Sequence, residues 1–221
     1  MLLPPTDSKI VARRAEIVAA LRAIVPDGVV ADKSGLATFD SDALSAYHQT
    51  PLVCVLPSTR EQVSEILKFS HAEGVPIVPR GSGTSLSGGA LPREDGILIG
   101  MGRMKRILDI DYENGCVTVE PGVTNLNITK AVEANGFYYA PDPSSQVACS
   151  IGGNVAENSG GVHCLKYGLT AHNVLKVRGF TISGQAVTFG SDALDAPGLD
   201  LLPLIIGSEG MLAVTLEVTV R

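Results

Sequence analysis

Apolar positions recur at helical spacing near the start of the chain. Over residues 8–24 they fall on one face of a helix, with Arg13, Arg14 and Glu16 on the opposite face. The apolar face consists of Ile10, Ala15, Ile17, Val18, Leu21 and Ile24. Residues 29–50 show little periodicity, and only Asp40 to Leu44 predicts a short helical turn with its own aspartate cap. We therefore expect residues 1–51 to form an N-terminal helical arm.

A strand–helix–strand pattern follows this arm. Residues 52–56 are continuously apolar, as in a buried strand, and Thr59 with Gln62 forms a helix-capping pattern. The helix continues through His71, whose place in the last turn suits the helix dipole, and Gly74 ends it. Residues 75–78 and 96–100 predict two further buried strands. Because such units join parallel strands, this sheet is expected to be at least partly parallel.

The second half of the chain has more strand than helix patterning. Residues 107–111 and 116–120 alternate with period two on either side of Asn114-Gly115, which predicts a hairpin. A helix is expected after the capping residue Thr124, and its buried face is Leu126, Ile128, Ala131 and Val132. Residues 173–183 and 185–189 predict a second hairpin, residues 200–206 a short helix and residues 211–221 a last strand. The fold class indicated is α+β.

The amino-acid composition excludes several classes of function for this chain. Hydrophobic residues make up 45% of the chain and charged residues 18%, which is typical of a folded protein with a sizeable core. The net charge of −6 argues against a nucleic-acid partner. The sequence contains no apolar run long enough to cross a membrane and no secretory leader pattern. The four cysteines are scattered, which predicts a reducing, cytoplasmic setting with neither zinc nor disulfides.

The stretch from Pro79 to Gly89 is unlike a packed element, since no core residue lies between Pro79 and Leu86. It directly follows a predicted buried strand and is rich in glycine, serine and threonine, with Arg80 as its cation. Glycines let backbone N–H groups approach a ligand, and successive N–H groups in such turns form an anion-binding concavity. We interpret the stretch as a cradle for a diphosphate; a mobile linker is the alternative.

Two common phosphate loops do not match this stretch. A P-loop needs lysine and then serine or threonine after its last glycine, whereas Gly89 is followed by Ala90 and Leu91. The dinucleotide fingerprint needs a third glycine where Leu86 stands, and the residues after Gly89 are turn-like instead of helical. The cradle is therefore of another type.

Two further glycine motifs complete a recognisable set. The second runs over residues 150–161, preceded by Pro141 and a serine pair, and the third is Gly207-Ser208-Glu209-Gly210. In this order the three motifs resemble flavoenzymes of the vanillyl-alcohol oxidase type, which have the PCMH-type FAD-binding fold. Within that group the chain is most similar to the FAD-linked D-lactate and glycolate dehydrogenases. The resemblance extends from about residue 51 to residue 221.

The resemblance implies an FAD-binding domain of two α/β lobes. Residues 52–110 would form a small lobe with a mixed, partly parallel sheet. Residues 111–221 would form a larger lobe with a mainly antiparallel sheet and flanking helices. FAD would lie between the lobes, bound non-covalently because Thr84 and Cys149 are not expected to tether it. The substrate (cap) domain of the family would be absent from this stretch of chain.

The resemblance also carries site residues over to this chain, motif by motif. The first motif and the N–H groups that open a helix at residue 151 would meet the diphosphate, and the last motif the adenosine end. The cofactor-binding residues implied are Pro79, Arg80, Gly81, Ser82, Gly83, Thr84, Ser85, Pro141, Ser144, Ser145, Ile151, Gly152, Gly153, Asn158, Gly160, Gly161, Ile206, Glu209, Gly210 and Val214. No catalytic residue and no metal ligand is predicted, and His163 is expected to be structural.

The chemistry implied is oxidation of a 2-hydroxy acid, glycolate or D-lactate, by hydride transfer to the flavin. This stretch alone is expected to be inactive. The alternative is a stand-alone flavin- or nucleotide-binding module, or an FAD subunit without its own turnover. An NADPH-using reductase of the cell-wall type shares the fold but would need a third domain. By likeness to the glycolate oxidase branch, the partners implied are a second flavin subunit and an iron–sulfur subunit, with any membrane association through them.

Overall fold

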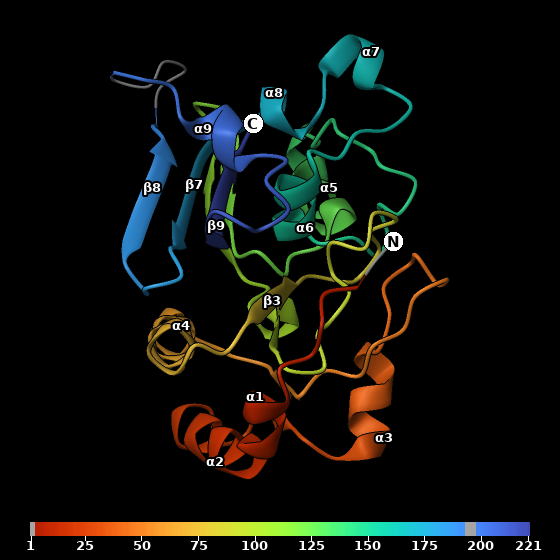
Figure 1. Ribbon diagram of the computed structural model, residues 1–221. Coiled ribbons are helices and arrows are strands. Elements are labelled where there is room, and N and C mark those ends of the chain that lie inside the picture. Colours follow the sequence, from red (N-terminus) through yellow and green to blue (C-terminus); the bar gives the residue numbers. More distant parts are fainter. Residues whose placement is uncertain (1–2, 193–197) are drawn as a thin grey trace.

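The computed structural model describes residues 3–192 and 198–221, which form two β-sheets with helices around each (Figure 1). The elements up to residue 103 are α1 (Ser8–Ala12), α2 (Arg14–Ile24), β1 (Val29–Val30), α3 (Lys33–Leu36), η1 (Ala37–Phe39), β2 (Val53–Val55), α4 (Arg60–Glu73), β3 (Ile77–Arg80), β4 (Ile97–Gly100) and η2 (Met101–Arg103). The later elements are β5 (Ile107–Asp111), β6 (Cys116–Val119), α5 (Asn125–Val132), η3 (Glu133–Asn135), α6 (Ile151–Glu157), α7 (Cys164–Tyr167), α8 (Thr170–Asn173), β7 (Val174–Phe180), β8 (Ala186–Gly190), α9 (Leu202–Ile205) and β9 (Val214–Val220).

The first sheet has the strand order β1-β2-β4-β3. Strands β2 and β3 both run parallel to β4, whereas β1 pairs antiparallel with β2. Successive side chains of a strand point to opposite faces, so Val53 and Val55 pack in one core with α2 and α4, while Cys54 packs on the other side with Leu36 of α3. The expected partly parallel sheet and its strand–helix–strand unit are confirmed.

The N-terminal arm differs in detail from the expectation. The helix over residues 8–24 is broken into α1 and α2 at Arg13, whose side chain pairs with Glu16 and with Glu73 of α4. Strand β1 and helix α3 were not predicted, because segments this short carry no periodicity. The expected helical turn from Asp40 to Leu44 is wrong: Asp42 instead accepts a hydrogen bond from the Leu44 N–H in an open turn.

The second sheet is antiparallel throughout, with the order β5-β6-β9-β7-β8. Both predicted hairpins, β5–β6 and β7–β8, are present, and α5, α6 and α9 pack on the sheet. On α5, Ile128 and Val132 are buried as expected, but Leu126 is only half-buried. The expected α+β class, with one small mixed sheet and one larger antiparallel sheet, is confirmed.

The two sheets meet along β9 and the end of β7. Phe180, Val214 and Leu216 pack into the same hydrophobic core as α2, α4, β2 and β4. Strand β5 belongs to the second sheet from Ile107, so that sheet starts a few residues before the predicted lobe boundary at residue 110, and β1 places part of the predicted arm in the first sheet. None of the helices in the described residues has the length and apolar character needed to cross a bilayer.

Candidate functional site

The glycine- and serine-rich stretch over residues 79–89, here called loop 79–89, leaves the first sheet at the end of β3. β3 is an edge strand, where Pro79 is tolerated because its missing N–H faces no partner strand. Beyond the strand, the five successive N–H groups from Ser82 to Leu86 have no hydrogen-bond acceptor among the described residues. Gly83 has a φ of +70°, a left-handed conformation that bends the loop and favours glycine. The loop thus presents a row of unpaired donors.

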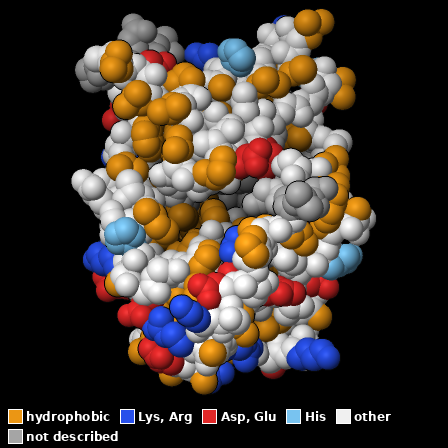
Figure 2. Space-filling model, viewed as in Figure 1, with side chains coloured by type: hydrophobic (Ala, Val, Ile, Leu, Met, Phe, Trp, Pro, Cys, Tyr) orange, Lys and Arg blue, Asp and Glu red, His pale blue; other side chains and the backbone are white. Residues whose placement is uncertain are grey.

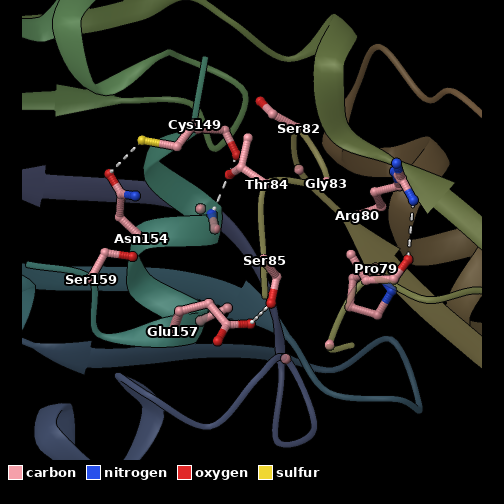
Figure 3. Close-up of a pocket in the computed structure, with 18 of the residues that line it drawn as sticks. Pro79, Arg80, Ser82, Gly83, Thr84, Ser85, Cys149, Asn154, Glu157 and Ser159 are labelled. Atoms are coloured by element: carbon pink, nitrogen blue, oxygen red, sulfur yellow. Dashed lines mark hydrogen bonds between the residues drawn. The ribbon is translucent and has the colours of Figure 1, made fainter. Parts of the chain in front are cut away.

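A cavity of about 300 Å³ lies between loop 79–89 and α6, at the junction of the two halves of the molecule. Figure 2 shows the hollow across the middle of the molecule, with acidic and hydrophobic side chains on its rim. In Figure 3 loop 79–89 stands on one side of the cavity and α6, carrying Asn154 and Glu157, on the other. A second hollow of about 230 Å³ adjoins it and shares Gly89, Glu209 and Gly210 as walls. The size and the shared walls are typical of an elongated ligand site.

Loop 79–89 approaches α6 too closely for a side chain at its nearest point. A Cβ atom on Gly81 would lie 2.1 Å from the Ser150 Oγ atom, so glycine is required there. Ser150 is the N-cap of α6, and its Oγ accepts the Gly153 N–H. The first and second glycine motifs therefore define one end of the cavity together.

The expectation that free N–H groups at the start of α6 meet the cofactor is wrong. The Ile151 N–H donates to the Val123 carbonyl at 2.8 Å, and the Gly152 N–H donates to the Pro121 carbonyl at 2.9 Å. The next N–H groups along the helix are held by Ser150, so the first turn has its acceptors within the protein. The donors available to a ligand lie in loop 79–89 and not in this helix.

Two of the hydroxyl groups in loop 79–89 are also committed within the protein. Ser85 and Ser87 each donate to the Glu157 carboxylate, both at 3.1 Å, which fastens the loop to the last residue of α6. Figure 3 shows the bond from Ser85. These two hydroxyl hydrogens are therefore not free to bond a ligand. Ser82 and Thr84 keep hydroxyls that make no hydrogen bond to the described residues.

The Arg80 guanidinium lies behind the loop instead of projecting into the cavity. It donates to the carbonyl oxygens of Ser41 at 2.7 Å and Ala90 at 3.2 Å, and it lies 5.9 Å from the centre of the Phe39 ring. Burial lowers the pKa of this guanidinium, which nevertheless stays protonated. Arg80 thus adds positive charge beneath Gly83 and holds both ends of the loop in place.

The structure brings most of the implied cofactor-binding residues to the wall of the cavity. Those that line it are Pro79, Arg80, Gly81, Ser82, Gly83, Thr84, Ser85, Ser144, Ser145, Gly152, Gly153, Gly160, Glu209, Gly210 and Val214. They come from segments of the chain far apart in sequence, and both halves of the molecule contribute.

Five of the implied residues do not line the cavity and instead shape its walls from outside. Ile151 and Ile206 are buried in the second core, so their side chains face away from the cavity. The Asn158 side chain accepts the Ala171 N–H, and the Pro141 carbonyl accepts from Asn125. Gly161 packs against the Asp142 backbone, where a Cβ would lie 1.9 Å from the carbonyl oxygen. A direct contact of these five residues with a cofactor remains a prediction.

Other residues that sequence reasoning did not select also line the cavity. They are Leu86, Gly89, Ala90, Met101, Pro121, Pro143, Cys149, Ser150, Asn154, Ala156, Glu157, Ser159, Ala213 and Thr215. Half of them lie inside the first two motifs, and most of the others lie within a few positions of a predicted site residue, so nearness to a motif was the available signal. Cys149 is buried, as expected. Met101 and Pro121 lie far from every motif, and only the fold brings them to the site.

His163 lies beside the cavity wall and does not line it. Its Nδ1 atom lies 2.6 Å from the Asp142 Oδ2 atom, and its backbone N–H also donates to the same carboxylate. Burial raises the pKa of Asp142, but the hydrogen bonds from His163 lower it further, so the net pKa is below its usual range. The pair fastens the segment before α7 to the 141–145 segment, in keeping with the structural role expected for His163.

Comparison with known proteins places this geometry in context. Residues 51–190 match the protein family described as FAD binding domain. The chain is 56% identical over 209 residues to the glycolate oxidase subunit GlcD of Escherichia coli (strain K12), a match that covers 94% of this chain and 42% of that protein. It is 38% identical over 170 residues to a D-lactate dehydrogenase of Archaeoglobus fulgidus, covering 76% of this chain and 38% of that protein.

A solved structure of alkyldihydroxyacetonephosphate synthase has a similar fold. It superposes with a TM-score of 0.83 at 24% identity, covering 100% of this chain and 41% of that chain. At this identity the likeness concerns the fold alone, and it supports the PCMH-type arrangement of the two sheets. The chain spans less than half the length of these curated relatives and of this structure.

Proposed function

Because this chain belongs to the family of FAD-binding domains, whose cofactor is FAD, we propose that FAD lies in the cavity between loop 79–89 and α6. The observation that carries the placement is the row of unpaired N–H groups from Ser82 to Leu86 at the cavity wall. Unpaired backbone donors of this kind suit a diphosphate, which supplies several acceptor oxygens and negative charge. Binding is non-covalent in this proposal.

Backbone dipoles must provide most of the attraction for the diphosphate. Among the described lining residues Arg80 is the one cation, and its guanidinium is held by carbonyl oxygens behind the loop. Glu157 and Glu209 line the same cavity and would repel an anion. Close N–H···O contacts outweigh such repulsion only at short range, so the diphosphate is proposed to sit directly on Ser82 to Leu86.

The ends of FAD are assigned by the two other motifs. The flavin and ribityl end is proposed to lie towards Ser144, Ser145 and Gly160, and the adenosine end towards Glu209 and Val214. Two features support this direction: the second hollow adjoins the cavity at Glu209, and the opposite wall is formed by the 143–150 segment and α6. Residues of both motifs line the same cavity, so an extended ligand is proposed to touch both.

The activity proposed for the whole protein is oxidation of a 2-hydroxy acid such as glycolate or D-lactate. The relatives named glycolate oxidase subunit and D-lactate dehydrogenase support it. When bound, the flavin accepts a hydride from the substrate carbon. The residues of this chain bind the cofactor, hold it between the two sheets and shield one side of it from water. A module that only binds a nucleotide is less well supported by these relatives.

Subunit partners also belong to the proposal. The name of the bacterial relative describes a subunit, which supports a multi-subunit enzyme. We propose a second flavin subunit and an iron–sulfur subunit as the partners, with a cytoplasmic location and any membrane contact made through them. Co-purification of the full-length protein with flavin and iron tests this proposal, and a full-length protein that turns over glycolate as a lone subunit would contradict it.

A flavin titration tests the cofactor proposal. The purified 221-residue chain is mixed with FAD, separated from free ligand, and its visible spectrum recorded. We expect flavin absorbance with the protein, displacement by ADP, and full release of FAD when the protein is denatured. No flavin retained at saturating FAD would overturn the placement, and flavin still attached after denaturation would overturn the non-covalent binding.

The isolated chain is expected not to reduce a dye when glycolate is added. The titratable side chains that line the cavity in the described residues are Arg80, Cys149, Glu157 and Glu209. Arg80 and Glu157 are already bonded within the protein, and no histidine reaches the cavity wall among those residues. Glycolate-dependent dye reduction by this chain at a rate comparable to a full-length relative would contradict the expectation.

A further inference from the structure

Two asparagines form a buried polar pair in the second core, behind the cavity wall. Asn125 is the first residue of α5 and Asn154 lies in α6, and their side chains are 0% and 2% exposed. Buried amides are rare in cores unless each polar atom has a partner. The burial of these two amides therefore needs an explanation, and their hydrogen bonds provide it.

The orientation of both amides is fixed by a backbone carbonyl. Asn125 Nδ2 lies 3.0 Å from the Pro141 oxygen, and a carbonyl can only accept, so Nδ2 is the donor. The second hydrogen of Nδ2 points to the Asn154 Oδ1 atom, also at 3.0 Å. The Cys149 thiol lies 3.8 Å from the same oxygen. Asn154 Oδ1 is thus the acceptor of these hydrogen bonds, so the Nδ2 atom of Asn154 points the other way.

The Asn154 Nδ2 atom opens into the cavity. It has no acceptor among the described residues, and it is not one of the buried polar atoms sealed off without a partner. Asn154 lines the cavity, so the small exposed area of this buried residue faces the ligand space. Figure 3 shows the Asn154 oxygen turned to the Cys149 sulfur and its nitrogen on the side of loop 79–89.

The pair has an energetic cost that packing does not explain. Asn125 Oδ1 is buried without a partner among the described residues. Such an orphaned acceptor is unfavourable, and a pair of apolar side chains of similar shape would avoid it. The hydrogen-bonded pair Asn125–Asn154 ends in one unpaired donor at the cavity. This arrangement is explained if the donor forms a hydrogen bond with the ligand.

We propose that Asn154 Nδ2 is a fixed hydrogen-bond donor to an acceptor atom of the flavin ring, and that Asn125 is the positioning residue that holds it. The inference rests on the proposed placement of FAD: the Asn154 amide contacts Cys149, and the Cys149 N–H donates to the carbonyl of Ser145, which belongs to the end assigned to the ring. A neutral donor suits a carbonyl oxygen or an unprotonated ring nitrogen. Held by α5 and the 141–145 segment, the amide cannot turn to offer its oxygen instead.

The exchange of Asn154 for Asp tests the donor. Asp keeps the shape and still accepts from Asn125, but it presents a carboxylate oxygen where the Nδ2 donor was. FAD affinity is measured by flavin fluorescence, and ADP, which lacks the ring, is measured by competition. We expect FAD affinity to fall by about 10-fold or more, while ADP affinity changes less than about twofold. The matched control is Asn127→Asp, an exposed asparagine on the same helix as Asn125.

A second readout separates a donor from a structural residue. Reduction adds negative charge to the ring, so the carboxylate of Asn154→Asp should lower the midpoint potential of the bound flavin. Asn125→Ala frees the Asn154 amide to turn. It should lower the FAD affinity and the midpoint potential, each by a smaller amount than Asn154→Asp does. Both are compared with the wild-type chain.

The outcomes distinguish this inference from the cofactor proposal. If the wild-type chain binds no FAD, the cofactor proposal fails and the inference fails with it. If the wild type binds FAD and Asn154→Asp leaves both affinity and potential unchanged, the donor role alone is overturned. Equal loss of FAD and ADP binding in Asn154→Asp would also overturn it, because a ligand without the ring would then depend on Asn154.

Discussion

Glu157 has two opposed effects on the candidate site. Its carboxylate accepts the hydroxyls of Ser85 and Ser87 and so holds loop 79–89 in shape. The same carboxylate lines the cavity, where its charge opposes an anionic ligand. The bonds need only an acceptor oxygen, whereas the repulsion needs the charge. The two effects can therefore be separated by substitution.

Glu157→Gln should raise FAD affinity several-fold. The amide oxygen still accepts from Ser85 or Ser87, but the negative charge beside the diphosphate is gone. Glu157→Ala removes both the acceptor oxygens and the negative charge. It should lower FAD affinity because loop 79–89 loses its hydrogen bonds to α6. Fluorescence titration of the two variants measures the difference. Equal weakening in both would contradict this account of Glu157.

Gly83→Ala should weaken FAD binding by about 10-fold or more, since a left-handed conformation is costly for alanine. The φ at Gly83 is +70°, and a Cβ there would lie 2.3 Å from the Arg80 guanidinium. Gly102→Ala is the control, because a Cβ at Gly102 has nothing within 4 Å and no positive φ opposes it. An unchanged affinity in Gly83→Ala would show that the loop does not need this bend.

Single-residue roles were only partly predictable. The glycine motifs identified the cavity because residues without Cβ atoms are required where two segments meet, as at Gly81 and Ser150. Hydrogen-bond partners were not predictable, because they come from segments distant in sequence. The carbonyls of Pro121 and Val123 satisfy the start of α6, and nothing in the motif around Ile151 indicates them.

Among the elements, the N-terminal arm depends on one buried carboxylate. Asp95 is 2% exposed, receives a two-pronged bond from Arg93 at 2.8 Å, and accepts the Asp7 N–H just before α1 at 2.8 Å. Burial raises the pKa of Asp95, but these bonds lower it further, so its net pKa is below the usual range. The arm is therefore held to the first sheet by an ionised group.

Asp95→Asn should lower the free energy of unfolding by about 1–3 kcal/mol near neutral pH, because the charged bonds to Arg93 and Asp7 are lost. A depressed pKa contributes stability above the unfolded-state value of about 3.9, and that contribution is lost as the pH falls through the folded-state value. The variant should thus lose less stability than the wild type between about pH 4 and pH 2. Urea unfolding at several pH values between about 2 and 7 measures the free energy of unfolding of both proteins. Glu94→Gln, at an exposed neighbouring position, is the control. Parallel pH profiles for Asp95→Asn and wild type would contradict the assignment.

Long, periodic elements were predictable, and short ones were not. α4 and the hairpin β5–β6 follow the expected residues closely, since their patterns repeat several times. β1 and α3 contain too few residues to show a period, and they form because β2 offers an open edge and Asp32 caps α3. At the break between α1 and α2, Arg13 pairs with Glu73 of α4, a contact that the local sequence does not reveal.

For the whole molecule, the junction of the two sheets is fixed by Glu217. This residue of β9 is 9% exposed and pairs with Arg60 of α4 and, at 3.3 Å, with Arg178 of β7. Phe180, Val214 and Leu216 pack beside it in the first core. The two walls of the cavity come from the two sheets, so this junction also sets the width of the proposed FAD site.

Glu217→Gln should lower the free energy of unfolding by about 1–3 kcal/mol, because the negative charge that pairs with Arg60 and Arg178 is removed. Arg178→Ala should cost less than about 1 kcal/mol, since its contact is long and its side chain is largely exposed. Urea unfolding of the two variants gives the comparison. A larger loss from Arg178→Ala than from Glu217→Gln would contradict this ranking.

The two-sheet architecture could be expected from the order of strand and helix patterns together with the three motifs. The position of the boundary could not, because Ile107 to Asp111 shows the same alternation whichever sheet it joins. Leu216 and Val214 likewise show a strand pattern without indicating that they enter the core of the other sheet. Assembly at this scale depends on which apolar faces meet in space.

Hydrogen exchange of the loop amides, measured with and without FAD, tests whether the diphosphate lies on the N–H groups from Ser82 to Leu86. Backbone amides without acceptors exchange rapidly, and a diphosphate bound to them would slow their exchange. We expect FAD, and ADP as well, to slow exchange from Ser82 to Leu86 and to leave the already bonded amides of Ile151 and Gly152 little changed. FAD binding with no slowing from Ser82 to Leu86 would contradict this placement.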